Sequence, residues 1–116
     1  MKHIIVYGSL KKDKFNYGRF SGQKFLKPVD LKGFDLFDLG AYPTVCRGHG
    51  QIKAELHEVS DETADYIGQM ESGAGFFEES VSVELHGRKI HASIYTWPKY
   101  KINEYGCPKI ESGDWQ

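Results

Sequence analysis

The chain begins with an apolar segment that breaks sharply. Residues 3–7 are rich in β-branched and apolar side chains, and Gly8-Ser9 follows at once. An apolar run of this length, bounded by glycine and a small polar residue, is typical of a buried strand that enters a turn. The pattern therefore predicts a strand over 3–7 with a tight turn directly after it.

Two further strands are expected before the middle of the chain. Residues 31–39 alternate imperfectly between apolar and polar positions, which indicates a strand with a bulge, and segment 40–43 ends it. Residues 50–59 alternate with a period of two, which predicts a half-buried strand. Its apolar face consists of Ile52, Ala54 and Leu56. Its expected solvent face consists of Lys53, Glu55 and His57.

A helix is predicted after this strand. Ser60 is a suitable N-terminal capping residue, and acidic residues fill the first turn that follows it. Apolar residues then recur at helical spacing until about Glu71, where the glycine-containing segment 72–75 ends the pattern. Beyond it, strands are expected over 76–85 and 89–97, joined by a hairpin connection.

The remaining segments carry weaker patterns. Residues 11–23 are polar and contain glycines, so we expect a loop with at most a short helix near 16–20. The tail from Pro98 is expected to be mostly irregular. Five short strands with one helix, and no alternation of strand and helix, predict one α+β or small-barrel domain over residues 1–116.

Composition narrows the range of functions. The 15 Lys plus Arg residues against 16 Asp plus Glu give a formal net charge of -1, so nucleic acid is a poor candidate partner. No apolar segment approaches the ~20 residues that cross a bilayer, and the first apolar run is too short for a signal peptide. Cys46 and Cys107 lie far apart, which favours free thiols in a reducing compartment. We therefore expect a cytoplasmic protein that does not enter membranes; the sequence predicts no oligomeric state.

The turn at Val6 to Leu10 is the first candidate for chemistry. A strand followed by glycine and serine can aim successive backbone N–H groups at one point, which stabilises an anionic group or a developing oxyanion. An ordinary turn that ends a strand is the simpler interpretation of this motif alone, because Gly-Ser is a common turn pair.

Glu71 is the second candidate. It ends the predicted helix directly after an apolar residue, with a glycine-rich loop behind it. A partly desolvated carboxylate there has a raised pKa and can transfer protons near neutral pH. On its own the position also fits a solvated glutamate at a helix end, since exposed Glu is the norm.

The histidines and cysteines suggest no metal centre. Cys46, His49 and His57 lie in one region and His86 and His91 in another, and these spacings match no closed zinc set. A Cys-His nucleophile pair stays open, but neither cysteine follows a strand-to-helix turn. No metal and no cofactor is predicted.

Several ordered segments, taken together, are more specific than any one of them. They are Val6 to Leu10, Leu39 to Pro43, Gly50 to Val59, Met70-Glu71-Ser72-Gly73 and Ile110 to Trp115, with Asn16 after the basic residues of the first loop. Their order and content along the whole chain resemble the γ-glutamylcyclotransferase-like family, in particular its small branch of γ-glutamylamine cyclotransferases. The resemblance implies a small mixed β-barrel of five or six strands with one main helix.

The resemblance also implies an activity without metal or organic cofactor. The α-amine of a γ-glutamyl group would attack its own γ-carbonyl, giving 5-oxoproline and a released amine, so the partner is a small-molecule γ-glutamyl substrate. Glu71 would be the catalytic acid and base. The residues expected to bind substrate are Tyr7, Gly8, Ser9, Leu10, Asn16 and Tyr42.

One departure from the family pattern concerns substrate choice. Where members commonly carry Tyr-any-Arg after the catalytic loop, this chain has Phe76-Phe77-Glu78. The carboxylate of Glu78 would suit a cationic substrate, or it is a solvated strand residue. The sequence is also compatible with two other functions. One is a non-catalytic small-molecule-binding module of the same fold, and the other is an interaction protein with an aromatic surface for a partner. The rings of that surface are Tyr95, Trp97, Tyr100, Tyr105 and Trp115.

Overall fold

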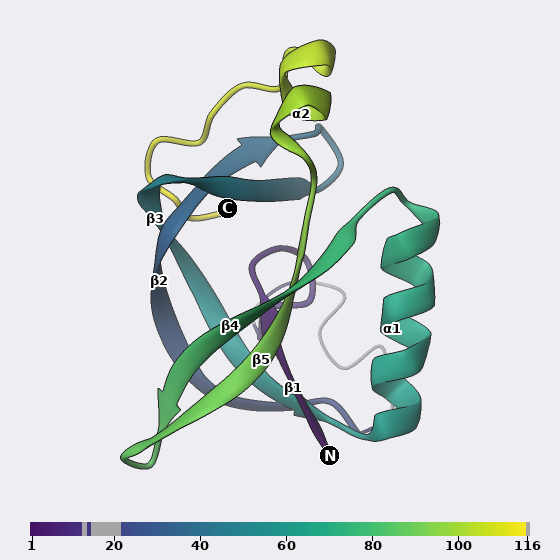
Figure 1. Cartoon of the computed structure of the whole chain (residues 1–116), viewed down its shortest axis with the longest axis vertical. Helices are drawn as coiled ribbons and strands as arrows, with labels where there is room; N and C mark the ends of the chain where they lie inside the picture. The colour runs from purple at the N-terminus through teal and green to yellow at the C-terminus, as the bar shows by residue number, and fades with distance from the viewer. Residues whose placement is uncertain (13, 15–21, 116) are drawn as a thin grey trace.

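The protein is an α+β fold with a five-stranded mixed sheet and two helices, seen in a computed structural model that describes residues 1–12, 14 and 22–115 (Figure 1). In chain order the elements are β1 (Lys2–Val6), β2 (Lys24–Asp38), β3 (Pro43–Val59), α1 (Asp61–Gly73), β4 (Phe77–Leu85), β5 (Arg88–Thr96) and α2 (Lys99–Tyr105). The short helix considered near 16–20, and Asn16 with it, lie outside the described residues.

The sheet has the strand order β2-β3-β1-β5-β4 and is open, so the expectation of a closed barrel is wrong. β1 lies in the middle, antiparallel to β3 and parallel to β5. Closure would require a backbone ladder between the edge strands β2 and β4. Within the described part of the chain those edges share apolar core residues and a side-chain contact, in which Lys27 Nζ donates to the carbonyl of Glu84 at 3.0 Å.

The central strand buries both of its faces, as its unbroken apolar run requires. Ile4 and Val6 point to the side covered by α1, where they pack with Ile67. Ile5 points to the other side, into the larger cluster of core residues contributed by the remaining strands. β1 therefore passes between two apolar layers, and the turn that follows it emerges at their common edge.

β2 and β3 are longer than the pattern predicts. β2 begins at Lys24, and β3 begins at Pro43 and already contains the charged and glycine residues of 47–50. The expected bulge in β2 is confirmed, with a register shift between Lys32 and Phe34 around Gly33, whose φ is 91°. Alternation missed the starts of both strands because irregular residues interrupt a period-two pattern without interrupting the ladder.

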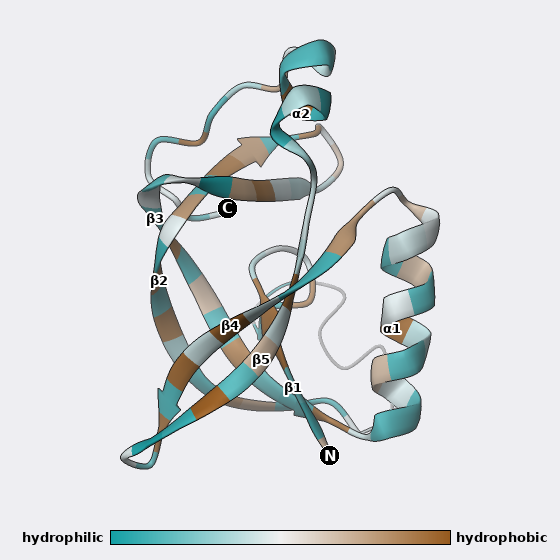
Figure 2. Ribbon diagram, in the orientation of Figure 1, coloured by the Kyte–Doolittle hydropathy of each residue, from teal (hydrophilic) through white to brown (hydrophobic). Residues whose placement is uncertain are grey.

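The signals for α1 and the hairpin are confirmed. Ser60 Oγ accepts a hydrogen bond from the N–H of Thr63 at 3.1 Å, which caps the helix. His86 and Gly87 connect β4 to β5 with φ values of 52° and 77°, the left-handed pair that a two-residue hairpin turn requires. In Figure 2 hydrophobic and hydrophilic residues alternate along both strands of this hairpin, as expected of strands with one buried face.

The tail differs from the irregular segment that was expected. Pro98 precedes a short helix, α2, and Gly106 ends it in the left-handed conformation. A helix of two turns is too short to show a periodic pattern, although its proline and glycine boundaries were visible. The chain then runs beside the end of β2, where Ile110 N–H donates to the carbonyl of Leu36 at 2.8 Å.

His57 corrects the expected solvent face of β3. The alternation of residues places it beside exposed Lys53, yet its side chain is fully buried. The start of β2 covers this end of the strand, and the ring of Phe25 lies edge-on against His57 with centroids 5.7 Å apart. A period of two assigns a residue to one face of the strand. Whether that face is buried depends on residues from a distant part of the chain that pack on it.

Candidate active site

A cavity of about 340 Å³ opens at the end of β1. Its wall is built from β1 and the turn after it, the loop before β3 with the first residue of β3, the last turns of α1 with the segment that follows, and one residue of β5. The sequence-predicted residues that line it together are Tyr7, Gly8, Ser9, Leu10, Tyr42 and Glu71. Of the predicted set, Asn16 alone lies outside the described residues.

Glu71 is a carboxyl residue in the wall of the cavity whose pKa is shifted by its environment. Burial raises the pKa of its carboxyl to about 7, and the adjacent helix C-terminus acts in the same direction. In the described part of the chain its carboxylate makes neither a hydrogen bond nor an ion pair. A carboxyl group that is half protonated at neutral pH can both accept and donate a proton.

The end of α1 fixes the position of Glu71. Its carbonyl accepts from the N–H of Phe76 at 3.0 Å, and the carbonyl of Ser72 accepts from the N–H of Gly75 at 3.0 Å. These two bonds form a Schellman motif, which needs a residue in the left-handed region. Gly75 supplies it with a φ of 88°. The chain then turns back so that Phe76 lines the same cavity as Glu71.

The turn after β1 packs tightly against the opposite loop. A Cβ atom on Gly8 would lie 3.0 Å from Cδ of Pro43, so a larger residue would separate the two segments. The N–H of Lys11 donates to the carbonyl of Gly8 at 3.0 Å and closes the turn. Close approach thus favours glycine here, which the sequence motif alone did not distinguish from an ordinary turn.

Tyr7 forms a fixed wall of the cavity. Its hydroxyl donates to the backbone carbonyl of Tyr95 in β5 at 2.6 Å. Burial, with a smaller contribution from the charge of Glu71, holds the pKa of Tyr7 well above its usual range. The phenol therefore stays neutral, and its proton is used in the hydrogen bond to the backbone of β5.

Aromatic side chains line part of the cavity, and further rings pack behind them. The rings of Tyr42 and Phe76, which both line the cavity, have centroids 6.2 Å apart. Behind Phe76, Trp97 follows at 5.8 Å and Tyr105 at 5.7 Å from Trp97. Of the rings considered as a partner surface, Tyr95 lines the cavity and Trp97 is packed, whereas Tyr100 and Tyr105 are exposed.

The sequence did not identify every residue of the cavity. Ile67 and Met70 carry the helical apolar pattern and were assigned to the core, and they also line the cavity. Phe76 and Tyr95 carried no signal of their own. They reach the cavity because one follows the helix end and the other pairs in register beside β1.

Glu78 lies away from this cavity. It lines a second depression on the other side of Tyr95, between α1 and β4, and accepts a hydrogen bond from Ser93 Oγ at 2.5 Å. Its charge and burial of the ring contribute to the rise of the Tyr95 pKa to about 12, burial being the larger cause. The missing arginine of the family pattern is therefore replaced by a carboxylate that faces a different surface.

Three further observations concern the described residues. They contain no group of three His, Cys, Asp or Glu side chains placed to hold a metal ion. Both cysteines are free thiols, as predicted, with Cys46 buried. None of the helices in residues 1–12, 14 and 22–115 has the length and apolar character needed to span a bilayer.

The fold and the cavity together define a class: an α+β protein with a cavity lined by a carboxyl group of raised pKa and by a main-chain turn. Residues 4–116 match the family described as "Gamma-glutamyl cyclotransferase, AIG2-like", and the chain belongs to that family. The resemblance drawn from the sequence is confirmed at the level of the family.

Individual relatives agree with this assignment. A protein of Pyrococcus horikoshii, provisionally named a gamma-glutamylcyclotransferase, is 32% identical over 96% of this chain and 88% of its own length. A Vibrio cholerae protein with the same provisional name is 29% identical over 99% of this chain and 96% of its own length. The crystal structure from P. horikoshii has a TM-score of 0.78 at 30% identity, covering 98% of this chain and 89% of that one.

Proposed function

We propose that this protein is an enzyme that cyclises a γ-glutamyl amine or a related γ-glutamyl conjugate to 5-oxoproline and releases the amine. The observation that supports it most is that Glu71, a carboxyl group with a pKa raised to about 7, lines one cavity with the turn 7–10. Membership of the family supports the reaction class.

The proposed reaction needs one proton-transferring group. Glu71 accepts a proton from the α-ammonium group of the substrate, and the freed amine attacks the γ-carbonyl carbon. A new C–N bond closes the five-membered ring and moves the carbonyl electron pair onto oxygen. Glu71 then returns the proton to the leaving nitrogen, the old C–N bond breaks, and the carbonyl re-forms. The ring nitrogen also gives up its second proton, which Glu71 passes to the released amine, so 5-oxoproline keeps one N–H and the amine leaves as its ammonium ion. Atoms and charge balance without a cofactor.

The other residues of the cavity orient the substrate. Backbone N–H groups of Gly8, Ser9 and Leu10 are proposed to hold the substrate and the oxyanion that develops during attack. Tyr7 and Tyr42 are proposed to bound the glutamyl group. Because nucleophile and electrophile belong to one molecule, fixing their relative orientation supplies much of the rate enhancement.

A direct test uses γ-glutamyl-ε-lysine and a panel of γ-glutamyl amines with detection of 5-oxoproline. Wild-type protein should form it, and Glu71→Gln should lower kcat by about 10²- to 10⁴-fold, the usual contribution of a positioned acid or base. Glu62→Gln, an exposed residue in the first turn of the same helix, is the matched control and should keep full activity.

The test also separates the enzyme from a non-catalytic binding module. No 5-oxoproline from any γ-glutamyl compound contradicts the proposal. If such a compound then raises the thermal stability of both wild type and Glu71→Gln, the cavity binds without turnover.

A further inference from the structure

The turn after β1 is held from the side away from the cavity by side chains of two other segments. The N–H of Lys12 donates to Oε1 of Glu55 in β3 at 2.7 Å. The carbonyl of Leu10 accepts from Nε2 of Gln23, just before β2, at 3.2 Å. Both bonds act on the backbone within two residues of the cavity lining, so they fix the direction of its peptide groups.

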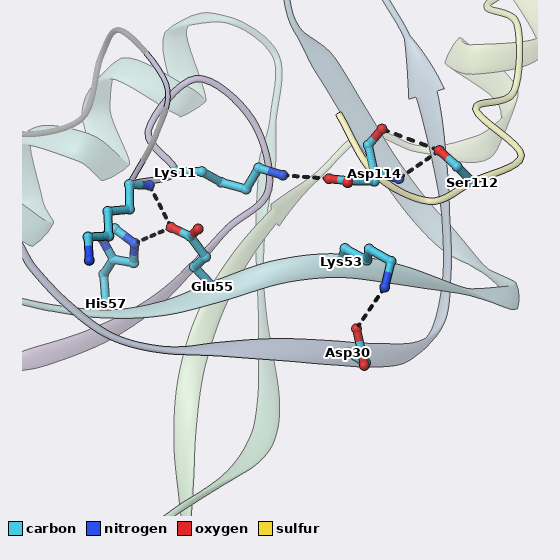
Figure 3. A network of polar contacts seen from close by, with 8 residues as sticks. Lys11, Asp30, Lys53, Glu55, His57, Ser112 and Asp114 are labelled. Atoms are coloured by element: carbon cyan, nitrogen blue, oxygen red, sulfur yellow. Dashed lines mark hydrogen bonds and ion pairs between the residues drawn. The ribbon is translucent and has the colours of Figure 1, made fainter. Parts of the chain in front are cut away.

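A buried histidine joins these two contacts. His57 Nε2 lies 3.0 Å from Oε1 of Glu55, as Figure 3 shows, and His57 Nδ1 lies 3.0 Å from Nε2 of Gln23. The turn, Glu55, His57 and Gln23 thus form a closed ring of contacts. The imidazole is fully buried at its centre.

The carbonyl of Leu10 decides the proton positions in this ring. A carbonyl only accepts, so the amide group of Gln23 that faces it is the NH₂ group. The same NH₂ group faces Nδ1 of His57, which must therefore be an acceptor. The ring proton is left on Nε2, where it donates to the carboxylate of Glu55. Burial lowers the pKa of His57, which agrees with a neutral imidazole.

We propose that His57, as the neutral tautomer protonated on Nε2, is a positioning residue that holds the cavity turn 8–10 through Glu55 and Gln23. The ring constrains both the carbonyl before Lys11 and the N–H after it. Lys11 itself is tied to the tail, because its Nζ lies 2.8 Å from Oδ1 of Asp114 (Figure 3). The catalytic consequence rests on the proposed function, whereas the tautomer and the clamp do not.

The tautomer is tested on the wild-type protein by long-range ¹H–¹⁵N correlation spectra of the His57 ring at pH 7. A neutral ring with its proton on Nε2 is expected. A proton on Nδ1, or a doubly protonated ring, would remove the acceptor for Gln23 and overturn the proposal. This measurement needs neither a variant nor turnover.

The clamp is tested by hydrogen exchange in His57→Gln, with His49→Gln as the matched control, an exposed histidine on the same strand. The amide of Lys12 should exchange at least about ten-fold faster in His57→Gln because its acceptor is no longer held in place. Unchanged exchange in a folded variant would overturn the proposal. The control should behave as wild type.

The consequence for catalysis is tested by steady-state kinetics on the same two variants. Loss of positioning should raise KM about three- to ten-fold, since the backbone groups that bind substrate are no longer aligned. A merely structural histidine would lower the amount of active protein, and hence apparent kcat, with KM unchanged. If wild type forms no 5-oxoproline, the proposed function fails, but hydrogen exchange and the tautomer still decide the role of His57.

Discussion

Two glutamates stand beside the same turn in opposite environments. Glu71 faces the cavity and, in the described part of the structure, its carboxylate has no hydrogen-bonding partner, so burial raises its pKa to about 7. Glu55 lies behind the turn, where Oε1 accepts from the N–H of Lys12 and lies 3.0 Å from His57 Nε2. One carboxylate is left without compensation for burial, and the other contacts a backbone N–H and an imidazole nitrogen through one oxygen.

The difference shows how neighbouring acidic residues acquire different tasks. Desolvation without a partner favours the protonated form of a carboxyl group and makes it a proton carrier near neutral pH. A carboxylate that accepts hydrogen bonds from a backbone N–H and an imidazole N–H instead holds those groups in place. Both residues are glutamates, so the difference between their proposed roles comes from their surroundings.

The largest expected effect comes from replacing each glutamate by glutamine and comparing turnover. Glu71→Gln removes the proposed proton carrier and should lower kcat by about 10²- to 10⁴-fold. Glu55→Gln keeps an oxygen acceptor for Lys12 and His57, so kcat should stay within about ten-fold of wild type. Formation of 5-oxoproline measures both. Equal losses in the two variants would contradict the division of roles.

Stability should respond to the second glutamate. Glu55→Ala leaves the buried Nε2–H of His57 without its acceptor and should lower the free energy of unfolding by about 1–3 kcal/mol. Urea denaturation followed by circular dichroism measures it. Glu58→Ala is the control on the same strand: its contact with His3 is long, at 3.7 Å, and partly exposed, so its loss should be below about 1 kcal/mol.

The helix end offers a smaller and more local test. Gly75→Ala forces a side chain into the left-handed region and towards Lys101 Nζ, and should cost about 1–2 kcal/mol. Gly73→Ala, two residues earlier, meets no atom within 4 Å. It should be neutral or stabilise the helix by up to about 1 kcal/mol. Thermal melts of both variants check this, and a loss at position 73 equal to that at 75 would argue against the Schellman motif.

The stability of the protein is also expected to depend on pH. The pKa of Glu71 is higher in the folded protein than in the unfolded chain, so the folded state binds more protons between these two pKa values. Its contribution therefore favours folding at low pH and is lost as pH rises from about 4.5 to about 7. The stability difference between wild type and Glu71→Gln, measured by urea denaturation across this range, should move against wild type and then level off. A flat difference would contradict the burial of Glu71.

Much of this arrangement was visible in the sequence because it depends on local signals. The apolar run before Gly8 and the capping serine before α1 predicted the strand and the helix that carry the site, and the order of motifs predicted the family. The meeting of Glu71 with the turn 7–10 was implied by the family resemblance. Glu71 lies near this turn because α1 packs against the face of β1 that carries Ile4 and Val6.

What could not be predicted depends on contacts between distant residues. His57 was assigned to solvent because alternation does not reveal that Phe25 and Gln23 cover it. The open sheet likewise depends on whether the edge strands meet, which no periodic pattern encodes. α2 was missed because two turns with one buried residue, Ile102, leave no amphipathic stripe.

The proposed role of Glu71 depends on the proton affinity of its carboxyl group, which can be measured without any substrate. The ¹³C chemical shift of the Glu71 side-chain carboxyl, followed from pH 4 to pH 9 and assigned by its absence in Glu71→Gln, reports its titration directly. We expect a midpoint near pH 7. A midpoint near 4.5, the ordinary value for glutamate, would mean that the group is solvated and would contradict its role as proton carrier.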